Sequence, residues 1–196
     1  MAGFTELILN SNAYRLLSAD KTSGRLSHAY MVLTSDKQYL REYLKIFARL
    51  IMCENSANSS CNVCRICRLL SDEKLADAHF YPEKQGDKLG AKEASEIIEE
   101  TFVKPYELDK KIFIIEDISD MNVSGQNKLL KTVEEPSQNT FILIGASSVH
   151  AVLPTVQSRV KKLEIPAFST DDLMKALAIE CPQRDKLAMA CRASDG

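Results

Sequence analysis

Residues 111–160, KIFIIEDISDMNVSGQNKLLKTVEEPSQNTFILIGASSVHAVLPTVQSRV, decide the fold because two short apolar runs flank one helical segment. The runs at 111–115 and 141–145 are typical of strands that are buried on both faces of a parallel sheet. Between them, residues 123–135 have helical periodicity and stop at Pro136, which cannot continue a helix. The stretch therefore predicts a strand, helix, strand unit of an α/β fold.

The polar residues that follow these two strands indicate nucleotide chemistry. Two carboxylates, Glu116 and Asp117, end the first strand, and a loop after the second strand leads to the isolated pair Ser158 and Arg159. Whether that chemistry occurs in this chain depends on a phosphate-binding loop, which has to come from elsewhere in the sequence.

The composition is that of a globular protein with one full domain and part of another. The chain has 196 residues, of which 45% are hydrophobic, and a chain of this length buries roughly 70% of its unfolded surface. The formal net charge of -2 gives no bulk reason to bind nucleic acid, so any DNA contact has to be local or shared with partners. Residues 1–10 lack the basic and apolar regions of a signal peptide, and no run of about 18 apolar residues occurs. We expect a soluble cytoplasmic protein with no membrane contact.

The rest of the chain alternates helices and strands by the same criteria. Ser35 and Gln38 have the spacing of a capping box, which predicts that a helix starts there, and the apolar stripe from Tyr39 to Ile51 is typical of core packing. The other predicted elements are a helix over 10–21, a strand over 29–33, a helix over 92–102 and a last strand over 160–165.

Residues 167–196 differ in character from the sheet-forming part of the chain. Ser169 and Asp172 form a second capping-box pattern that predicts a helix to about Ile179, and residues 185–192 predict another helix. Two short helices bury little surface by themselves. We therefore expect an α/β domain over 1–166 and the beginning of a helical domain, cut short, over 167–196.

A cysteine cluster within residues 53–67 carries the strongest local chemistry. Its members are Cys53, Cys61, Cys64 and Cys67. Four thiolates close a tetrahedral site around a structural zinc ion and leave no open position for catalysis. Free thiols and an iron–sulfur cluster are the alternatives, but no second cysteine group and no proline follow the last cysteine, so zinc is favoured. The two remaining cysteines, Cys181 and Cys191, are expected to be buried thiols.

The first strand is not followed by a phosphate-binding loop. Such loops use glycines to bring backbone N–H groups around the phosphates, a lysine for the outer phosphates, and Ser or Thr for Mg2+. Residues 34–41, TSDKQYLR, contain no glycine, place Asp36 where anions would bind, and have their one lysine before the helix. A helix N-terminus alone attracts anions weakly, so we expect no bound ATP.

Several short motifs occur together along the chain. They are His28-Ala29-Tyr30, the cysteine quartet, NKLLKTVEEP at 127–136, LPTV at 153–156, and Ser158-Arg159. In combination they resemble the AAA+ subunits of the bacterial clamp loader over nearly the whole chain, and most of all the delta-prime type of DNA polymerase III. The resemblance implies an AAA+-like parallel sheet flanked by helices, which is a P-loop NTPase-type fold without a working P-loop. It also implies a zinc-binding insertion at 53–67, the start of a helical lid domain, and a C-terminal collar domain that is absent from these residues.

The same resemblance implies that the nucleotide site has been lost in place. The family's ATP-binding members have glycines at the positions of Thr34, Lys37 and Tyr39, the phosphate lysine at Leu40, and the Mg2+ hydroxyl at Arg41.

The resemblance implies different roles for the polar residues that follow the two strands. Glu116 and Asp117 occupy the family's Asp-Glu pair in reversed order, and without nucleotide we expect them to be a solvated strand end or a cap near the following helix. Arg159, with Ser158 as its motif neighbour, would be an arginine finger that enters the ATP site of a neighbouring subunit, an effect worth roughly 1,000- to 100,000-fold in rate. Val160 stands where the family commonly has cysteine, which the finger does not need.

We therefore expect a non-ATPase stator subunit of the clamp loader that helps load the sliding clamp onto primed DNA at the replisome. Its implied partners are the ATP-binding and delta subunits in a hetero-pentamer, and the isolated fragment is expected to be a monomer. The alternatives are an ATP-binding motor subunit of the gamma/tau type and a zinc-dependent nucleic-acid-binding module. His28, His79 and His150 have no ligand spacing and define no catalytic pair.

Overall fold

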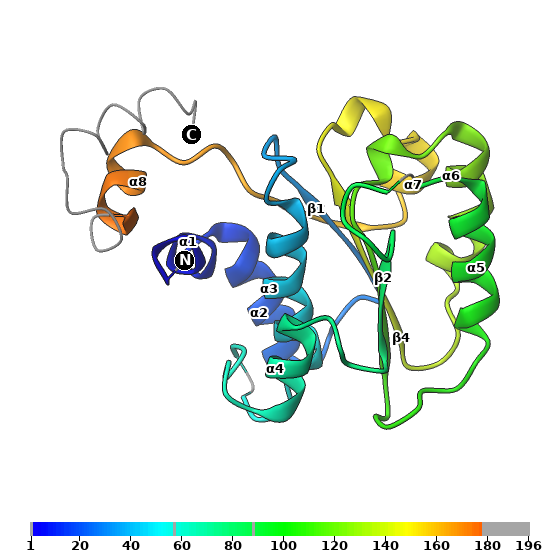
Figure 1. Ribbon diagram of the computed structural model, residues 1–196, viewed down its shortest axis with the longest axis horizontal. Coiled ribbons are helices and arrows are strands. Elements are labelled where there is room, and N and C mark those ends of the chain that lie inside the picture. The colour runs from blue at the N-terminus through cyan, green and yellow to red at the C-terminus, as the bar shows by residue number, and fades with distance from the viewer. Residues whose placement is uncertain (1, 57, 88, 178–196) are drawn as a thin grey trace.

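A five-stranded parallel sheet lies at the centre of the molecule. The computed structural model (Figure 1) describes residues 2–56, 58–87 and 89–177. Within them the strand order is β2-β3-β4-β1-β5. The strands are β1 (Ala29–Leu33), β2 (Ala78–Tyr81), β3 (Lys111–Ile115), β4 (Thr140–Ala146) and β5 (Lys161–Glu164). Every pairing is parallel, so each connection between strands crosses over a face of the sheet.

Helices cover both faces of this sheet. One layer holds α1 (Ala2–Leu9), α2 (Asn12–Thr22), α3 (Leu40–Met52) and α4 (Arg65–Ser71), and the other holds α5 (Ala91–Thr101), α6 (Val123–Glu134) and α7 (Pro154–Gln157) (Figure 1). Side chains alternate across the strands, so Tyr30 and Val32 pack into the first layer, whereas Met31 packs into the second. The last described helix, α8 (Thr170–Leu177), lies beside α1 (Figure 1).

The predicted α/β fold is confirmed, and the apolar runs locate its strands well. The predicted strands at 29–33 and 111–115 coincide with β1 and β3, and the strand predicted at 141–145 lies within β4. The helices predicted at 92–102 and 123–135 match α5 and α6 to within one residue at each end. These strands are buried almost throughout, which is the condition that makes a continuous apolar run a reliable signal.

The predicted helix start at the Ser35 capping box is wrong. Helix α3 begins at Leu40, and its N-cap residue, Tyr39, makes no side-chain cap. Nearby, Oδ1 of Asp36 accepts from the backbone N–H of Tyr39 at 3.3 Å, and its Oδ2 accepts from the Tyr43 hydroxyl at 2.8 Å. Asp36 thus orders the turn that precedes α3, and no side-chain N-cap is made at the start of the helix itself.

The predicted helix start at Ser169 is confirmed, with one of the two hydrogen bonds of a capping box. Ser169 precedes α8, and its Oγ accepts from the backbone N–H of Asp172 at 3.2 Å. The end of that predicted helix, the helix predicted at 185–192, and both Cys181 and Cys191 lie outside the described residues.

The helices α1, α4 and α7 and the edge strand β2 were not predicted. Across the described part of the chain, no helix has the length and apolar character needed to span a membrane.

Candidate functional site

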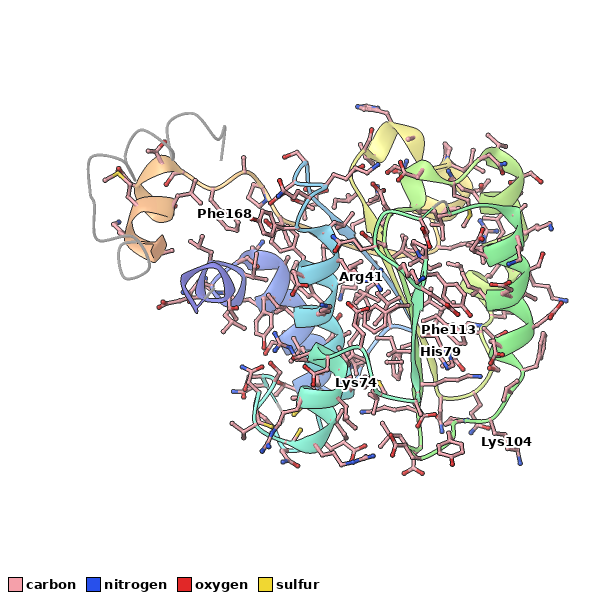
Figure 2. The ribbon with its side chains drawn as sticks, in the orientation of Figure 1. Arg41, Lys74, His79, Lys104, Phe113 and Phe168 are labelled. Atoms are coloured by element: carbon pink, nitrogen blue, oxygen red, sulfur yellow. The ribbon has the colours of Figure 1, made fainter. Side chains whose placement is uncertain are left out.

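The guanidinium of Arg41 is the centre of a buried ion cluster near the carboxyl ends of the strands. It extends from the first turn of α3 toward the sheet, is 3% exposed, and lies between α3 and β2 (Figure 2). All five of its N–H groups have acceptors. Nε and Nη2 donate to the two carboxylate oxygens of Glu73 at 2.9 and 2.6 Å. Nη1 donates to Glu116 Oε2 at 2.7 Å, and the backbone oxygens of Pro82 and Glu83 accept the remaining two N–H groups at 3.0 Å.

Electrostatics hold this cluster in its charged form. Burial opposes the charge on Arg41, yet the hydrogen bonds to Glu73 and Glu116 keep the pKa of Arg41 above its ordinary value. Arg41 also lowers the pKa of Glu73 to about 2, and Lys45, at 2.9 Å from the same carboxylate, adds to that effect. The two-point contact between Arg41 and Glu73 is the strongest geometry for such a pair. A nucleotide phosphate would have to displace carboxylates that are already fully paired.

The predicted solvated strand end is wrong for both carboxylates after β3, and the predicted cap is confirmed for one of them. Glu116 is 14% exposed because it turns inward to Arg41. Asp117 is 5% exposed, and its Oδ1 accepts from the backbone N–H of Ser119, which caps the 3-10 turn Ile118–Asp120. Asp117 also accepts from the backbone N–H and the hydroxyl of Ser147, at 3.1 and 2.6 Å, and so ties the end of β3 to the end of β4.

Lys37 does not face an open anion site either. Its ammonium group pairs with Asp120 at 2.6 Å and lies 3.7 Å from Asp117. Both carboxylates line a cavity of about 360 Å³ at this edge of the sheet, together with Glu116 and Asp87. Four carboxylates around one paired lysine give the cavity an acidic lining, which disfavours a triphosphate.

Close packing of Leu40 against Gly145 also fills space near the start of α3. Leu40, the first residue of α3, is fully buried. It packs over Gly145 of β4, where an added Cβ would lie 3.0 Å from Leu40 Cδ1 and 2.0 Å from the backbone oxygen of Glu116. Glycine is therefore required at this close approach of β3 and β4.

Arg159 presents a contrasting arrangement on the surface. Its side chain is 32% exposed and follows the short helix α7, whose last turn ends at Ser158. Nε donates to Glu134 Oε2 at 2.9 Å, and Nη1 donates to the backbone oxygen of Thr155 at 3.0 Å and, more weakly, to Ser158 Oγ at 3.4 Å. Among the described residues, Nη2 makes no hydrogen bond. Two N–H groups therefore remain available to an external acceptor.

The two arginines lie at opposite ends of the parallel strands; below, the end where the strands start is called the amino edge and the end where they stop the carboxyl edge. Lys161 begins β5 beside Tyr30 of β1, so the chain at Arg159 lies where the parallel strands start. The end of α6 lies there too, because His28, just before β1, contacts the Val133 backbone oxygen at 2.9 Å. Arg41 and its partners lie where the strands end. Strand β1 has five residues, which corresponds to about 16 Å. Arg159 is thus far from the edge where α/β folds bind nucleotides.

The four predicted metal ligands are brought together. The sulfur atoms of Cys53, Cys61, Cys64 and Cys67 all lie within 4.8 Å of one another. A tetrahedral zinc site with bonds of about 2.3 Å places its sulfurs about 3.8 Å apart, so a small inward movement would complete the site. Backbone N–H groups donate to three of the sulfurs at 3.3 to 3.4 Å, an arrangement that stabilises thiolates.

The environment of the cysteines also suits a metal that binds thiolates. Backbone N–H groups of Val63 and Cys64 lower the pKa of the Cys61 thiol to about 6. Burial raises the pKa of Cys67, whose negative charge would need a cation to be stable there. The cluster joins the end of α3 to the start of α4, where Cys64 is the N-cap.

His79 has structural surroundings, as expected. His79 lies in β2 and stacks on Phe113 of β3 with ring centres 4.9 Å apart (Figure 2). Burial lowers the pKa of His79, which favours the neutral ring. The sequence reasoning missed the acidic partners Glu73 and Glu134. Glu73 is distant from Arg41 in sequence and gave no signal, whereas Glu134 lies within the motif at 127–136 that carried the resemblance.

The strand order and the layers are those of an AAA+-like domain, and solved structures of that class superpose on the chain. A DNA polymerase III gamma subunit-related protein from Thermotoga maritima matches with a TM-score of 0.56 at 22% identity, over 89% of this chain and 56% of the other. A RuvB variant from Thermotoga maritima matches with a TM-score of 0.55 at 12% identity, over 95% of this chain and 55% of the other. At these identities the likeness establishes the fold.

Residues 9–169 match the family model described as DNA polymerase III, delta subunit, and the chain belongs to this family of bacterial clamp-loader subunits. It is 28% identical to DNA polymerase III subunit delta' of Bacillus subtilis, over 79% of this chain and 47% of that protein. It is also 24% identical to DNA polymerase III subunit gamma/tau of Mycobacterium tuberculosis, over 93% of this chain and 32% of that protein. The chain thus spans a third to a half of the length of these relatives and corresponds to an N-terminal part.

Proposed function

We propose that this chain is the N-terminal part of a delta-prime type stator, a clamp-loader subunit that does not hydrolyse ATP itself. The observation that carries the proposal is the Arg41 cluster, in which a buried cation takes two carboxylates in the region of the lost phosphate loop. Every donor there is already used within the chain. Such a domain would act on neighbouring subunits through residues at its surface. Residues 1–166 would form this α/β domain, and residues 167–196 would begin the helical lid.

Arg159 is proposed as the group that acts on a neighbouring ATP site. Arginine suits this role because its charge is permanent and its planar fork matches phosphate oxygens. At the amino edge of the sheet, Arg159 is distant from this chain's own cavity and exposed to an adjacent subunit. When ATP is hydrolysed in the neighbouring subunit's site, negative charge develops on the phosphate oxygens, and a fixed guanidinium stabilises that charge. Ser158 supplies the weak contact to Nη1.

The test is an Arg159→Ala variant of the full-length protein, assembled with the ATP-binding and delta subunits, the sliding clamp and primed DNA. We expect hydrolysis at the site next to this subunit to fall by about 1,000-fold, and clamp loading to fall with it. Lys162→Ala is a matched control, because Lys162 is a nearby exposed cation whose side chain, among the described residues, bonds to Gln157 alone. Unchanged DNA-stimulated hydrolysis in the Arg159→Ala complex would remove the finger assignment.

We also propose that the cysteine cluster holds a structural zinc ion. The donor set is four thiolates, all positions would be filled by protein, and the ion would fix α4 to the end of α3. In zinc fingers such a site contributes on the order of 10 kcal/mol to folding. Metal analysis of protein purified without chelator should give one zinc per chain, and Cys64→Ser should lose it. A yield far below one zinc per chain contradicts the assignment.

A motor subunit of the gamma/tau type is the second candidate, favoured by the match to gamma/tau over 93% of this chain. This candidate predicts saturable micromolar binding of Mg·ATP, whereas the stator predicts none. In either case the protein would work in the bacterial cytoplasm, beside the other loader subunits and DNA.

A further inference from the structure

Glu134 forms an ion pair with the guanidinium of Arg159. The stability of α6 does not explain a carboxylate at this position, which is the C-terminus of the helix. Glu134 is the last residue of α6, and Glu135 follows it as the C-cap residue. Carboxylates at a helix C-terminus are disfavoured by the helix dipole by roughly 0.3–1 kcal/mol each. The ion pair with Arg159 is the contact that Glu134 makes there, with Nε 2.9 Å from Oε2.

The geometry of the contact fixes the direction in which Arg159 points. Glu134 takes Nε from one side, and the Thr155 backbone oxygen takes Nη1 from the other. Ser158 Oγ, which itself donates to the Thr155 oxygen at 3.1 Å, lies 3.4 Å from Nη1. Three of the five N–H groups are thus engaged, and within the described residues Nη2 makes no hydrogen bond.

A surface arginine without such contacts would sample many rotamers, and fixing it costs about 2 kcal/mol of side-chain entropy. The hydrogen bonds to Arg159 within this chain restrict its rotamers before the subunits assemble. The guanidinium is therefore already oriented when it reaches its target, and binding loses less side-chain entropy. A carboxylate on Nε achieves this without occupying the Nη2 edge.

We propose that Glu134 is a positioning residue, which orients Arg159 so that its Nη2 edge faces the phosphates of a neighbouring subunit's nucleotide. The inference rests on the proposed finger role of Arg159 and adds the residue that sets its geometry. Glu134 itself touches no substrate, and its effect passes through Arg159.

The chain offers a matched control beside it. Glu135 is exposed and carries the same charge one residue further along, and no hydrogen bond or ion pair of its side chain occurs among the described residues. Replacing Glu134 or Glu135 changes the charge at the end of α6 equally, but only Glu134 replacement releases Arg159.

The experiment measures kcat and KM for ATP in DNA-stimulated hydrolysis by the complex assembled from full-length subunits. We expect Glu134→Ala to lower kcat at the neighbouring site by about 10-fold, because a misplacement of about 1 Å costs up to 100-fold. KM should stay within about 2-fold, since positioning acts on the transition state. Glu134→Gln keeps an acceptor for Nε but loses the charge, so we expect a fall of about 3-fold. Glu135→Ala should match the wild type.

Two further variants separate this inference from the finger assignment. If Glu134 acts through Arg159, the double variant Glu134→Ala with Arg159→Ala should be no slower than Arg159→Ala alone. A slow Arg159→Ala complex combined with a wild-type or faster Glu134→Ala complex overturns the positioning role and leaves the finger standing. A wild-type rate for Arg159→Ala overturns the proposed function itself.

An NMR readout on the isolated protein is independent of activity. The Arg159 Nε–Hε signal should move in Glu134→Ala and stay in place in Glu135→Ala. If the alanine variant fails to assemble, Glu134→Gln decides the question, because it keeps the size of the side chain. An unchanged kcat in an assembled Glu134→Gln complex contradicts the proposal.

Discussion

Arg41 and Arg159 are the same residue type in opposite circumstances. Arg41 is 3% exposed, and all five of its N–H groups are bonded inside the chain, whereas Arg159 is 32% exposed and leaves Nη2 without a partner among the described residues. One cation stabilises the carboxyl edge of the sheet, and the other is presented at the amino edge. The comparison shows that the same side chain can form a structural ion cluster in one place and keep free N–H groups at the surface in another.

The largest expected difference between the two arginines is in stability. Arg41→Met should lower the free energy of unfolding by about 3 kcal/mol, because it leaves the partly buried carboxylates of Glu73 and Glu116 without their cation. Urea denaturation followed by circular dichroism measures this change. A loss below about 1 kcal/mol would show that water replaces the guanidinium easily and that the cluster does not hold this edge together.

A smaller effect is expected when acid is added. The folded pKa of Glu73 is about 2, below its ordinary value of 4.5. The stability that this shift provides is therefore fully present above about pH 4.5 and is lost as the pH falls toward 2, a change on the order of 2 kcal/mol. The urea midpoint should fall across this window in the wild type. In Glu73→Gln the fall should be shallower, and an identical pH profile would contradict the pairing.

The smallest effect on stability is expected for the exposed arginine. Arg159→Ala should change the free energy of unfolding by less than about 1 kcal/mol, since exposed ion pairs contribute little. The same denaturation experiment measures it beside Arg41→Met. A loss as large as that of Arg41→Met would mean that Arg159 is mainly a structural residue.

The sequence predicted the parts of the molecule that local patterns determine. Apolar runs located β1 and β3 because those strands are buried almost throughout. The cysteine spacing predicted the cluster of four sulfur atoms because all four cysteines lie within a short segment. The sequence could not show where Arg41 turns, because its partner Glu73 is 32 positions away and comes from a polar turn without a pattern. For the same reason Glu116 was expected in solvent, although it is 14% exposed. Side-chain pairing between distant elements is decided by packing, which a linear pattern does not contain.

The central claim is that Arg41 and its carboxylates have replaced the nucleotide in this chain. Titration calorimetry of the full-length protein with Mg·ATP tests it most directly, with an ATP-binding loader subunit as the positive control. We predict no saturable heat up to about 1 mM nucleotide, because the cations of Arg41 and Lys37 are already paired with carboxylates there. Saturable binding with a micromolar Kd would contradict the account and favour a motor subunit.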